Sequence, residues 1–478
     1  MMSLLKMIVI RGSRQDTSVH VTLQELAINE SRAISLDRCP EDVLFHMANY
    51  LPWHSLLNFR LVCRHLSSIF APLTLRNISI GLYDYGFRTE KYYALYSATL
   101  PNLYQYAHTL EFRVTKQFDP PEKVLRALWK TLGRFHSLRS LRLIWESESE
   151  AVDEKLKNVV VTILRATNGK LERLVLQPPK RSCKAFPKAF QEIRGLTSLT
   201  IEHNDVGWAC TSYSSGSPNY DCCLFPMKTS ITPLLIANPQ IEDLAVIRRC
   251  MKGRISLNEL FYPAFPKLKT LVVSGLWFPS SKSGIHIADT LALLRNLCHL
   301  QVLTPYTQSN LDPLCILLKA AHTHLESLAT KQISPVLVDY LASFPGLQSL
   351  QLRELRSNED NSSVEVANAF LDEVLPRHAP TLERLVIEFA RNITFVPGWS
   401  FEADRWAPCI SSLTNLRFLA MHPTLIDGTG DSTRTYDTTV IISSYQLIID
   451  HTQNLPTSVD CKRRLALKKR LKRFFNTF

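Results

Sequence analysis

Apolar residues between about residue 100 and residue 421 recur with a spacing that predicts a series of short strands. The pattern is an apolar residue, two others, an apolar residue, one other and an apolar residue, and it occurs at least nine times. The middle positions of its copies are Leu141, Leu174, Leu199, Leu244, Leu271, Leu300, Leu328, Leu350, Leu385 and Leu419. Successive middle positions lie 22 to 45 residues apart. We expect one strand in each copy, with its last two apolar residues turned into a core.

The intervals between these strands carry the apolar spacing of helices. One helical face follows an Asp312-Pro313 start, where proline suits the first turn of a helix; it comprises Leu314, Leu317, Leu318 and Ala321. A second, which we expect to stop at Pro376, comprises Val364, Ala367, Leu371 and Val374. A third comprises Val152, Leu156, Val159, Val160 and Ile163. Strand and helix therefore alternate, which predicts parallel strands with helices outside them.

This alternation resembles the leucine-rich repeats over about 320 residues. The resemblance implies an α/β fold, an irregular solenoid of parallel strands with outer helices. The Asn that the family shows after its strand motif is visible only as Asn204, so other groups must satisfy the backbone carbonyls that it normally serves. Two alternatives are a purely helical array of the HEAT type and an ordinary mixed domain with chance leucine spacing. Nine copies weigh against chance, and prolines directly after the strands, as at Pro178-Pro179, weigh against helices throughout.

A different pattern, three short helices, occupies residues 36 to 73. Pro40 with Glu41 and Asp42 predicts the start of the first helix, because the acidic side chains complement its positive end. Its apolar face comprises Val43, Met47, Tyr50 and Leu51, ahead of a stop at Pro52. We expect Ser55 to cap the second helix and the third to end before Pro72. The apolar positions exceed what so small a unit could bury alone, which predicts a partner.

The segment from Ser55 to Arg64, Ser-Leu-Leu-Asn-Phe-Arg-Leu-Val-Cys-Arg, resembles the F-box. At the first helix the chain has Cys-Pro-Glu-Asp-Val-Leu from Cys39, where the family usually has Leu-Pro, and Ala48 is also smaller than usual. The resemblance implies docking on the Skp-type adaptor of SCF ubiquitin ligases. The adaptor contact implied comprises Leu36, Pro40, Val43, Leu44, Leu56, Leu57, Leu61 and Val62. Some of these must instead hold the three helices together, and the alternative is that the segment merely caps the following domain.

Charge is concentrated at the C-terminus. The net charge is +12, and residues 461 to 478 hold eight Lys and Arg without an acid, which leaves +4 for the rest. The body of the chain is therefore not a nucleic-acid surface by charge alone. Three interpretations of this tail stay open: a nuclear import signal, a contact with phosphate or an anionic membrane, and a solvated extension.

Candidate chemistry is sparse. The 11 cysteines are scattered without a CxxC pair, which favours reduced, mostly buried thiols in the cytosol or nucleus. Cys210 with Cys222 and Cys223 lacks the paired ligands of a zinc site, and His322 with His324 could offer at most one edge of a metal site. There is no nucleophile elbow, zinc-protease motif or phosphate loop, and Gly is only 15 of 478 residues. We therefore expect no enzyme activity, metal or cofactor.

These patterns predict four segments: an N-terminal arm, disordered or loosely attached, at 1–34, an F-box at 35–75, the solenoid at 76–425 and an extension with the basic tail at 426–478. The resemblance implies a substrate receptor that binds the Skp-type adaptor, and through it a cullin, while the solenoid binds an unknown protein substrate. Loops at 205–230 and 353–363 are candidates for that contact. One alternative is a non-catalytic repeat scaffold without ubiquitin transfer, and another is a nucleic-acid or membrane protein that uses the tail.

Overall fold

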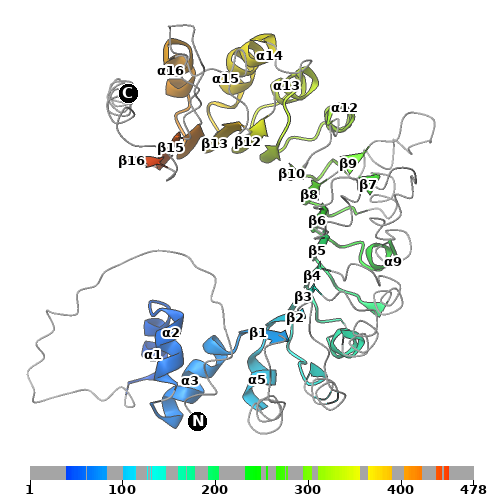
Figure 1. The fold of residues 1–478 in the computed structure, drawn as a ribbon, viewed down its shortest axis with the longest axis vertical. Helices are drawn as coiled ribbons and strands as arrows, with labels where there is room; N and C mark the ends of the chain where they lie inside the picture. The colour runs from blue at the N-terminus through cyan, green and yellow to red at the C-terminus, as the bar shows by residue number, and fades with distance from the viewer. Residues whose placement is uncertain are drawn as a thin grey trace, which may run out of the picture. The chain divides into compact units, whose positions relative to one another are not determined.

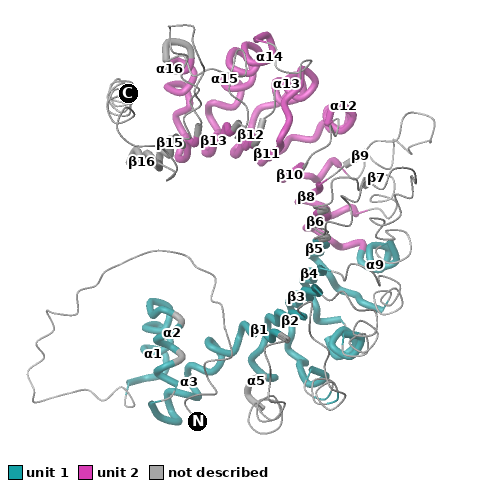
Figure 2. Tube along the Cα trace, in the orientation of Figure 1, with its two compact units in different colours: residues 1–204, 225–238 teal, residues 205–224, 239–478 magenta. Residues whose placement is uncertain are grey.

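The computed structural model separates the chain into two units, which Figure 2 distinguishes by colour. Unit 1 contains residues 1–204 and 225–238, and unit 2 contains residues 205–224 and 239–478. The structure describes residues 39–60, 62–82, 101–114, 126, 130, 132–146, 160–167, 169–177, 192–203, 232–248, 255–256, 265–274, 276–277, 294–303, 311–355, 364–389, 403–421, 438–443 and 446–451. The predicted arm at 1–34, the loop at 205–230, Asn204 and the basic tail lie outside these residues.

Unit 1 begins with three short helices and continues with parallel strands (Figure 1). The helices are α1 (Glu41–Ala48), α2 (Trp53–Phe59), α3 (Arg64–Thr74), α5 (Pro101–Tyr106) and α9 (Thr232–Ile236). The strands are β1 (Asn77–Leu82), β2 (Thr109–Val114), β3 (Ser140–Trp145), β4 (Arg173–Gln177) and β5 (Ser198–His203). Each strand pairs in parallel with the next one along the chain. Residues 160–166 are helical as well, as the sequence predicted.

Unit 2 repeats the same arrangement and ends in an antiparallel hairpin. Its parallel strands are β6 (Asp243–Arg248), β8 (Thr270–Ser274), β10 (His299–Leu303), β11 (Ser327–Thr330), β12 (Ser349–Leu355), β13 (Arg384–Phe389) and β14 (Phe418–Met421). The hairpin strands β15 (Thr438–Ser443) and β16 (Gln446–His451) follow β14, and β7 (Ile255–Ser256) pairs separately with β9 (Leu276–Trp277). The helices are α12 (Asp312–Ala320), α13 (Pro335–Ala342), α14 (Val364–Ala369), η8 (Phe370–Val374), α15 (Leu375–His378) and α16 (Ala403–Ser412). In Figure 1, α12 to α16 lie on one side of the strands.

The middle leucines of the sequence pattern lie opposite one another in the strand register. In unit 1 the aligned residues are Leu110, Leu141, Leu174 and Leu199. In unit 2 they are Leu244, Leu271, Leu300, Leu328, Leu350, Leu385 and Leu419. All of them are buried. The predicted fold class is therefore confirmed, because the repeat spacing brings equivalent side chains into one stacked row within each unit.

Buried polar side chains join successive repeats. Asn238 Oδ1 accepts a hydrogen bond from the amide of Leu196 (3.1 Å), and its Nδ2 donates to the carbonyls of Ile193 (3.0 Å) and Leu234 (2.8 Å). Thr323 Oγ1 donates to the carbonyl of Leu294 at 2.9 Å. Asn238 follows α9 and Thr323 follows α12, and each bonds backbone groups that precede the neighbouring strand of the sheet.

His378 performs the same task in unit 2. Its Nδ1 accepts a hydrogen bond from the amide of Leu347 (3.2 Å), so the neutral ring carries its proton on Nε2, which lies 3.0 Å from the carbonyl oxygen of Leu341. The ring also meets Phe344 edge-on at 5.3 Å. Burial lowers the pKa of His378 from 6.5 to about 4, and the hydrogen bond to Leu341 acts in the opposite direction. The imidazole is therefore neutral at pH 7.

Two sequence predictions in unit 2 are wrong. The helical run from Val364 does not stop at Pro376. The segment η8 is a π-helix, whose turn is wider than that of an α-helix. Pro376 follows it in the first turn of α15, where its missing amide hydrogen is not needed. The predicted loop at 353–363 begins later than expected, since residues 353 to 355 belong to β12. The prediction of a helix behind Asp312-Pro313 is confirmed by α12.

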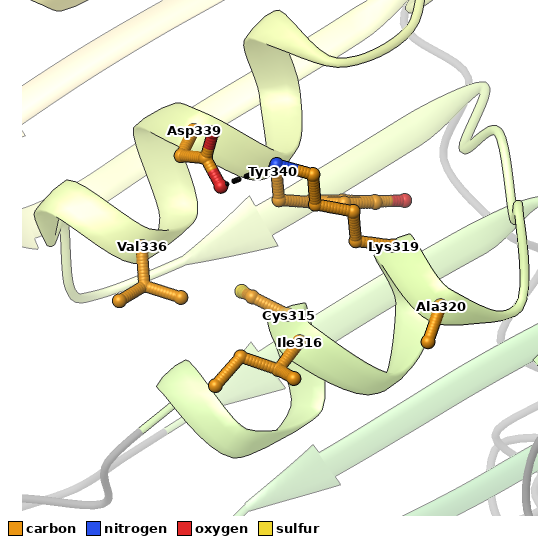
Figure 3. A pocket seen from close by; sticks show the side chains of 7 residues that line it. All are labelled: Cys315, Ile316, Lys319, Ala320, Val336, Asp339 and Tyr340. Atoms are coloured by element: carbon orange, nitrogen blue, oxygen red, sulfur yellow. Dashed lines mark hydrogen bonds and ion pairs between the residues drawn. The ribbon is translucent and has the colours of Figure 1, made fainter.

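A groove of ≈ 260 Å³ lies between α12 and α13 (Figure 3). Ile316 and Val336 line it, and an ion pair between Lys319 Nζ and Asp339 Oδ2 (2.6 Å) spans it. Cys315 lies at its floor and is itself buried. Burial raises the pKa of the Cys315 thiol, so this cysteine stays a protonated thiol at neutral pH.

Candidate adaptor-binding surface

Helix α1 presents a buried face and an exposed face. Pro40 stands at its N-cap, and Glu41 and Asp42 occupy the first turn, as the sequence predicted. Leu44 and Ala48 are one turn apart on the inner face and are buried. The amide of Leu44 donates to the carbonyl of Pro40 at 3.1 Å, which closes the first turn. The predicted apolar face is confirmed only in part, because α1 ends at Ala48 and leaves Tyr50 and Leu51 outside the helix. The sequence also did not show that the stripe of Leu44 and Ala48 is the one that packs inward.

The three helices share a small core of their own. Its buried members are Leu44, Ala48, Leu56, Leu66, Ile69 and Phe70, with Cys39, Leu51, Phe59, Cys63 and Leu73 partly buried against them. Phe59 and Phe70 meet with ring centroids 6.0 Å apart. This core explains why the apolar pattern is dense, because one part of it holds the helices together and only the remainder can face a partner.

The cysteine of the Leu-Val-Cys-Arg motif has a structural task. Cys63 is the N-cap of α3, and its Sγ accepts a hydrogen bond from the amide of Leu66 at 3.5 Å. Ser55, the predicted cap of the second helix, lies inside α2 instead, since Pro52 takes the N-cap. The prediction that the third helix ends before Pro72 is also wrong: α3 continues to Thr74, whose hydroxyl donates to the carbonyl of Phe70 at 2.8 Å. Burial of Ile69, Phe70 and Ala71 favours this continuation.

In the described part of the chain, large apolar side chains are exposed mainly on these helices and on the turns between them. Among the described residues, eight large apolar side chains are exposed, and three of them lie elsewhere, at Ile236, Ile316 and Val364. The other five are Val43 (43% exposed), Phe45 (36%), Met47 (39%), Tyr50 (77%) and Val62 (70%). Five exposed apolar side chains within 20 residues form a concentration that single surface positions do not require. We call these five residues the apolar surface.

Arg60, the C-cap of α2, carries an unsatisfied group. It is half-buried, and among the described residues its buried Nε has no hydrogen-bond partner. Desolvation lowers the pKa of the guanidinium from its ordinary value. A buried donor left unpaired is costly, so this group lowers the stability of the folded three-helix segment.

The predicted adaptor residues divide into three groups in the structure. Pro40, Val43 and Val62 are exposed, whereas Leu44 and Leu56 belong to the buried core. Leu36 and Leu61, and the side chain of Leu57, lie outside what the structure describes. Sequence reasoning did not name Phe45, Met47 and Tyr50 as contact residues. The helical spacing of Val43, Met47 and Tyr50 was the signal that could have included the last two.

Among the described residues, the other candidate sites do not contain a complete set of metal ligands. His322 and His324 are both exposed, and no group of three His, Cys, Asp or Glu residues among the described positions could hold a metal ion. Cys210, Cys222 and Cys223 lie outside the described residues. Five cysteines are described as free thiols; Cys315 is buried and the others, Cys39, Cys63, Cys298 and Cys409, are half-buried. None of the described helices is both long and apolar enough to cross a bilayer.

The described elements define an α/β solenoid of the leucine-rich-repeat type preceded by three short helices. Neither a protein family nor a curated protein matches the sequence. Among solved structures, the chain is similar to one chain of the crystal structure of the Rad7 and Elc1 complex in yeast, with 14% identity and a TM-score of 0.34. That likeness covers 75% of this chain and 90% of the other.

Proposed function

We propose that this chain is a substrate receptor of an SCF-type ubiquitin ligase, in which residues 35–75 act as an F-box on a Skp-type adaptor and the repeats of 76–425 bind a protein substrate. The observation that carries the proposal is the apolar surface, on the segment whose sequence resembles the F-box. Ubiquitin transfer would then belong to the cullin-bound subunits, with this chain acting in the cytosol or nucleus without a cofactor.

The exposed fractions give the scale of the adaptor contact. Fully burying one such side chain contributes about 1.5–3 kcal/mol, so covering the exposed part of Val62, 70% of its surface, contributes about 1–2 kcal/mol. Scaled in the same way, the exposed parts of the five side chains contribute about 4–8 kcal/mol before the cost of association is subtracted. In this proposal Leu44 and Leu56 act indirectly, because they fix the helices that present the apolar surface.

Co-expression with a Skp-type adaptor tests the proposal. We expect Val43→Asp with Val62→Asp to lower the recovered adaptor at least tenfold, because a carboxylate would be buried in an apolar contact. Val364→Asp is the matched control, since Val364 on α14 is 48% exposed and Val43 is 43% exposed. Equal recovery of adaptor by wild type, the double variant and the control would refute an adaptor role for this surface. Leu56→Asp is a poor test, because it would disrupt the three-helix core.

A second candidate function is a repeat scaffold that binds the adaptor without ubiquitin transfer. Cys39, smaller than the usual F-box leucine and only half-buried, favours a reduced adaptor contact and so keeps this candidate open. Ala48 is buried in the three-helix core and does not bear on that contact. Adaptor complexes recovered with no cullin would support the scaffold, whereas co-purification of cullin would support the receptor. A function through the tail at 461–478 predicts that deleting those residues abolishes partition onto nucleic acid or anionic vesicles.

A further inference from the structure

A hollow of ≈ 730 Å³ in unit 2 is lined by an excess of basic side chains. It lies at the turns that lead into β8, β10 and β11. Its charged or ionisable lining includes Lys267, Lys269, Arg295, His322, His324 and Glu242. These residues come from successive repeats, so the repeat geometry, rather than a single loop, sets their spacing.

One charge pair in the hollow is already satisfied. Lys269 Nζ lies 2.8 Å from Glu242 Oε2, and this hydrogen-bonded pair raises the pKa of Lys269 and lowers the pKa of Glu242. Lys267 and Arg295 are exposed and have no salt bridge or hydrogen bond to another described residue. Lys267 also acts electrostatically on Glu242, and Asp243 acts on Lys269. Glu326, just before β11, lies 4.0 Å from His299. The lining of the hollow therefore has three cationic side chains, Lys267, Lys269 and Arg295, against one carboxylate, that of Glu242.

The rim of the hollow is held in place before any ligand arrives. Asn296 Nδ2 donates to the carbonyl of Pro266 at 2.7 Å, which ties two neighbouring turns together. His324 stacks on Phe344 with ring centroids 5.3 Å apart and planes within 5° of parallel. A site with fixed walls loses little conformational entropy when it binds.

His322 occupies a backbone conformation that glycine normally takes. It is the non-glycine residue with positive φ in the described part of the chain, at 53°. It follows α12 in a Schellman arrangement, in which the amides of His322 and Thr323 donate to the carbonyls of Lys319 and Leu318. A residue with a Cβ is disfavoured there. The imidazole of His322 lines the hollow from this constrained turn.

We propose that this hollow binds an acidic segment of a protein partner through its anionic side chains. Lys267, Arg295 and the two histidines precede three adjacent strands. An extended acidic segment that crosses these strands would therefore meet basic side chains from more than one repeat. The inference rests on the proposed function, and it names acidic side chains as the feature by which the solenoid selects its substrate.

Fluorescence polarisation with the full chain tests this inference. The probe is a labelled peptide of alternating Asp and Gly, and the matched neutral peptide alternates Asn and Gly. We expect Lys267→Gln with Arg295→Gln to weaken binding of the acidic peptide about tenfold, because one exposed ion pair contributes up to about a fivefold factor. The double variant Arg173→Gln with Arg353→Gln removes the same charge at exposed positions outside the hollow and should bind like wild type.

His322→Gly separates folding from binding. Glycine suits the positive φ, so this variant should fold at least as well as wild type while binding the peptide about threefold more weakly. A phosphorylated peptide of equal length distinguishes phosphate from carboxylate as the preferred anion, and either result supports the acidic-segment site. Equal losses in the control variant, or tighter binding of a single-stranded oligonucleotide of equal charge, would overturn it. The Val43→Asp, Val62→Asp chain should bind the peptide normally, so the two proposals fail separately.

Discussion

Lowering the pH should destabilise unit 2 through one buried imidazole, that of His378. The ring must accept the amide hydrogen of Leu347 on Nδ1, and a protonated Nδ1 cannot accept it. The pKa falls from an ordinary value of 6.5 to about 4 in the folded chain. Between these two values the unfolded chain binds more protons than the folded chain, so stability is complete above pH 6.5 and decreases as the pH falls towards 4.

The expected magnitude follows from the size of the shift. Each unit of pKa difference corresponds to about 1.4 kcal/mol, so the contribution of His378 should fall by about 2 kcal/mol at pH 5 and by about 3 kcal/mol at pH 4. The substitution that isolates this effect is His378→Asn. Asn238 already shows that an Asn side chain can accept an amide hydrogen between repeats and does not titrate.

Urea unfolding at pH 7 and at pH 5 measures the effect. At pH 7 the His378→Asn chain should be less stable than wild type by about 1–2 kcal/mol, because the bond to the Leu341 carbonyl is lost. At pH 5 the two stabilities should converge, since only the wild type loses stability through this group. His136→Asn, at an exposed position, should keep the wild-type pH dependence. Parallel pH curves for wild type and His378→Asn would refute the reasoning.

Two further predictions concern buried groups. Asn238→Ala should lower the free energy of unfolding by about 2–4 kcal/mol, because it leaves the Leu196 amide and the Ile193 carbonyl unpaired. Asn296→Ala, which removes one exposed hydrogen bond, should lower it by less than about 1 kcal/mol. Similar losses for the two variants in urea unfolding would contradict this prediction. Cys315 should resist alkylation by iodoacetamide at pH 8 in the native chain and react in urea. Mass spectrometry of the peptide that contains Cys315 measures the alkylation. If native Cys315 were alkylated as fast as half-buried Cys39, its thiol would not be protected.

The strands of both units could be predicted from the sequence because their signal is local and repeated. A strand that buries Leu-x-x-Leu-x-Leu must place the same positions inward in every copy, so the spacing alone fixes the register that pairs Leu141 with Leu174 and Leu350 with Leu385. Helix ends were harder. Pro72 and Pro376 both signal a stop, yet buried neighbours in α3 and a widened turn at η8 continue each helix, and neither cause is visible in local sequence.

The candidate surface could be predicted only in part. The sequence indicated that residues 36 to 73 form helices with an excess of apolar positions, but two apolar stripes on α1 compete for the core. Leu44 and Ala48 lie inward because they pack with Leu66 and Phe70, and that contact spans more than 20 residues of chain. The basic hollow was not predicted at all, since its residues are far apart in sequence and converge only through strand pairing.

The polar bridge at Asn238 means that the repeats are not interchangeable parts. Its amide fits the backbone of Ile193 and Leu196 across 42 residues of chain, and His378 fits Leu347 through different chemistry. A shuffled or shortened array would keep its leucine row but set each polar side chain against the wrong neighbour. The order of the repeats is therefore specified by these few polar side chains. Grafting a repeat would require moving its polar side chain together with the backbone groups that it bonds.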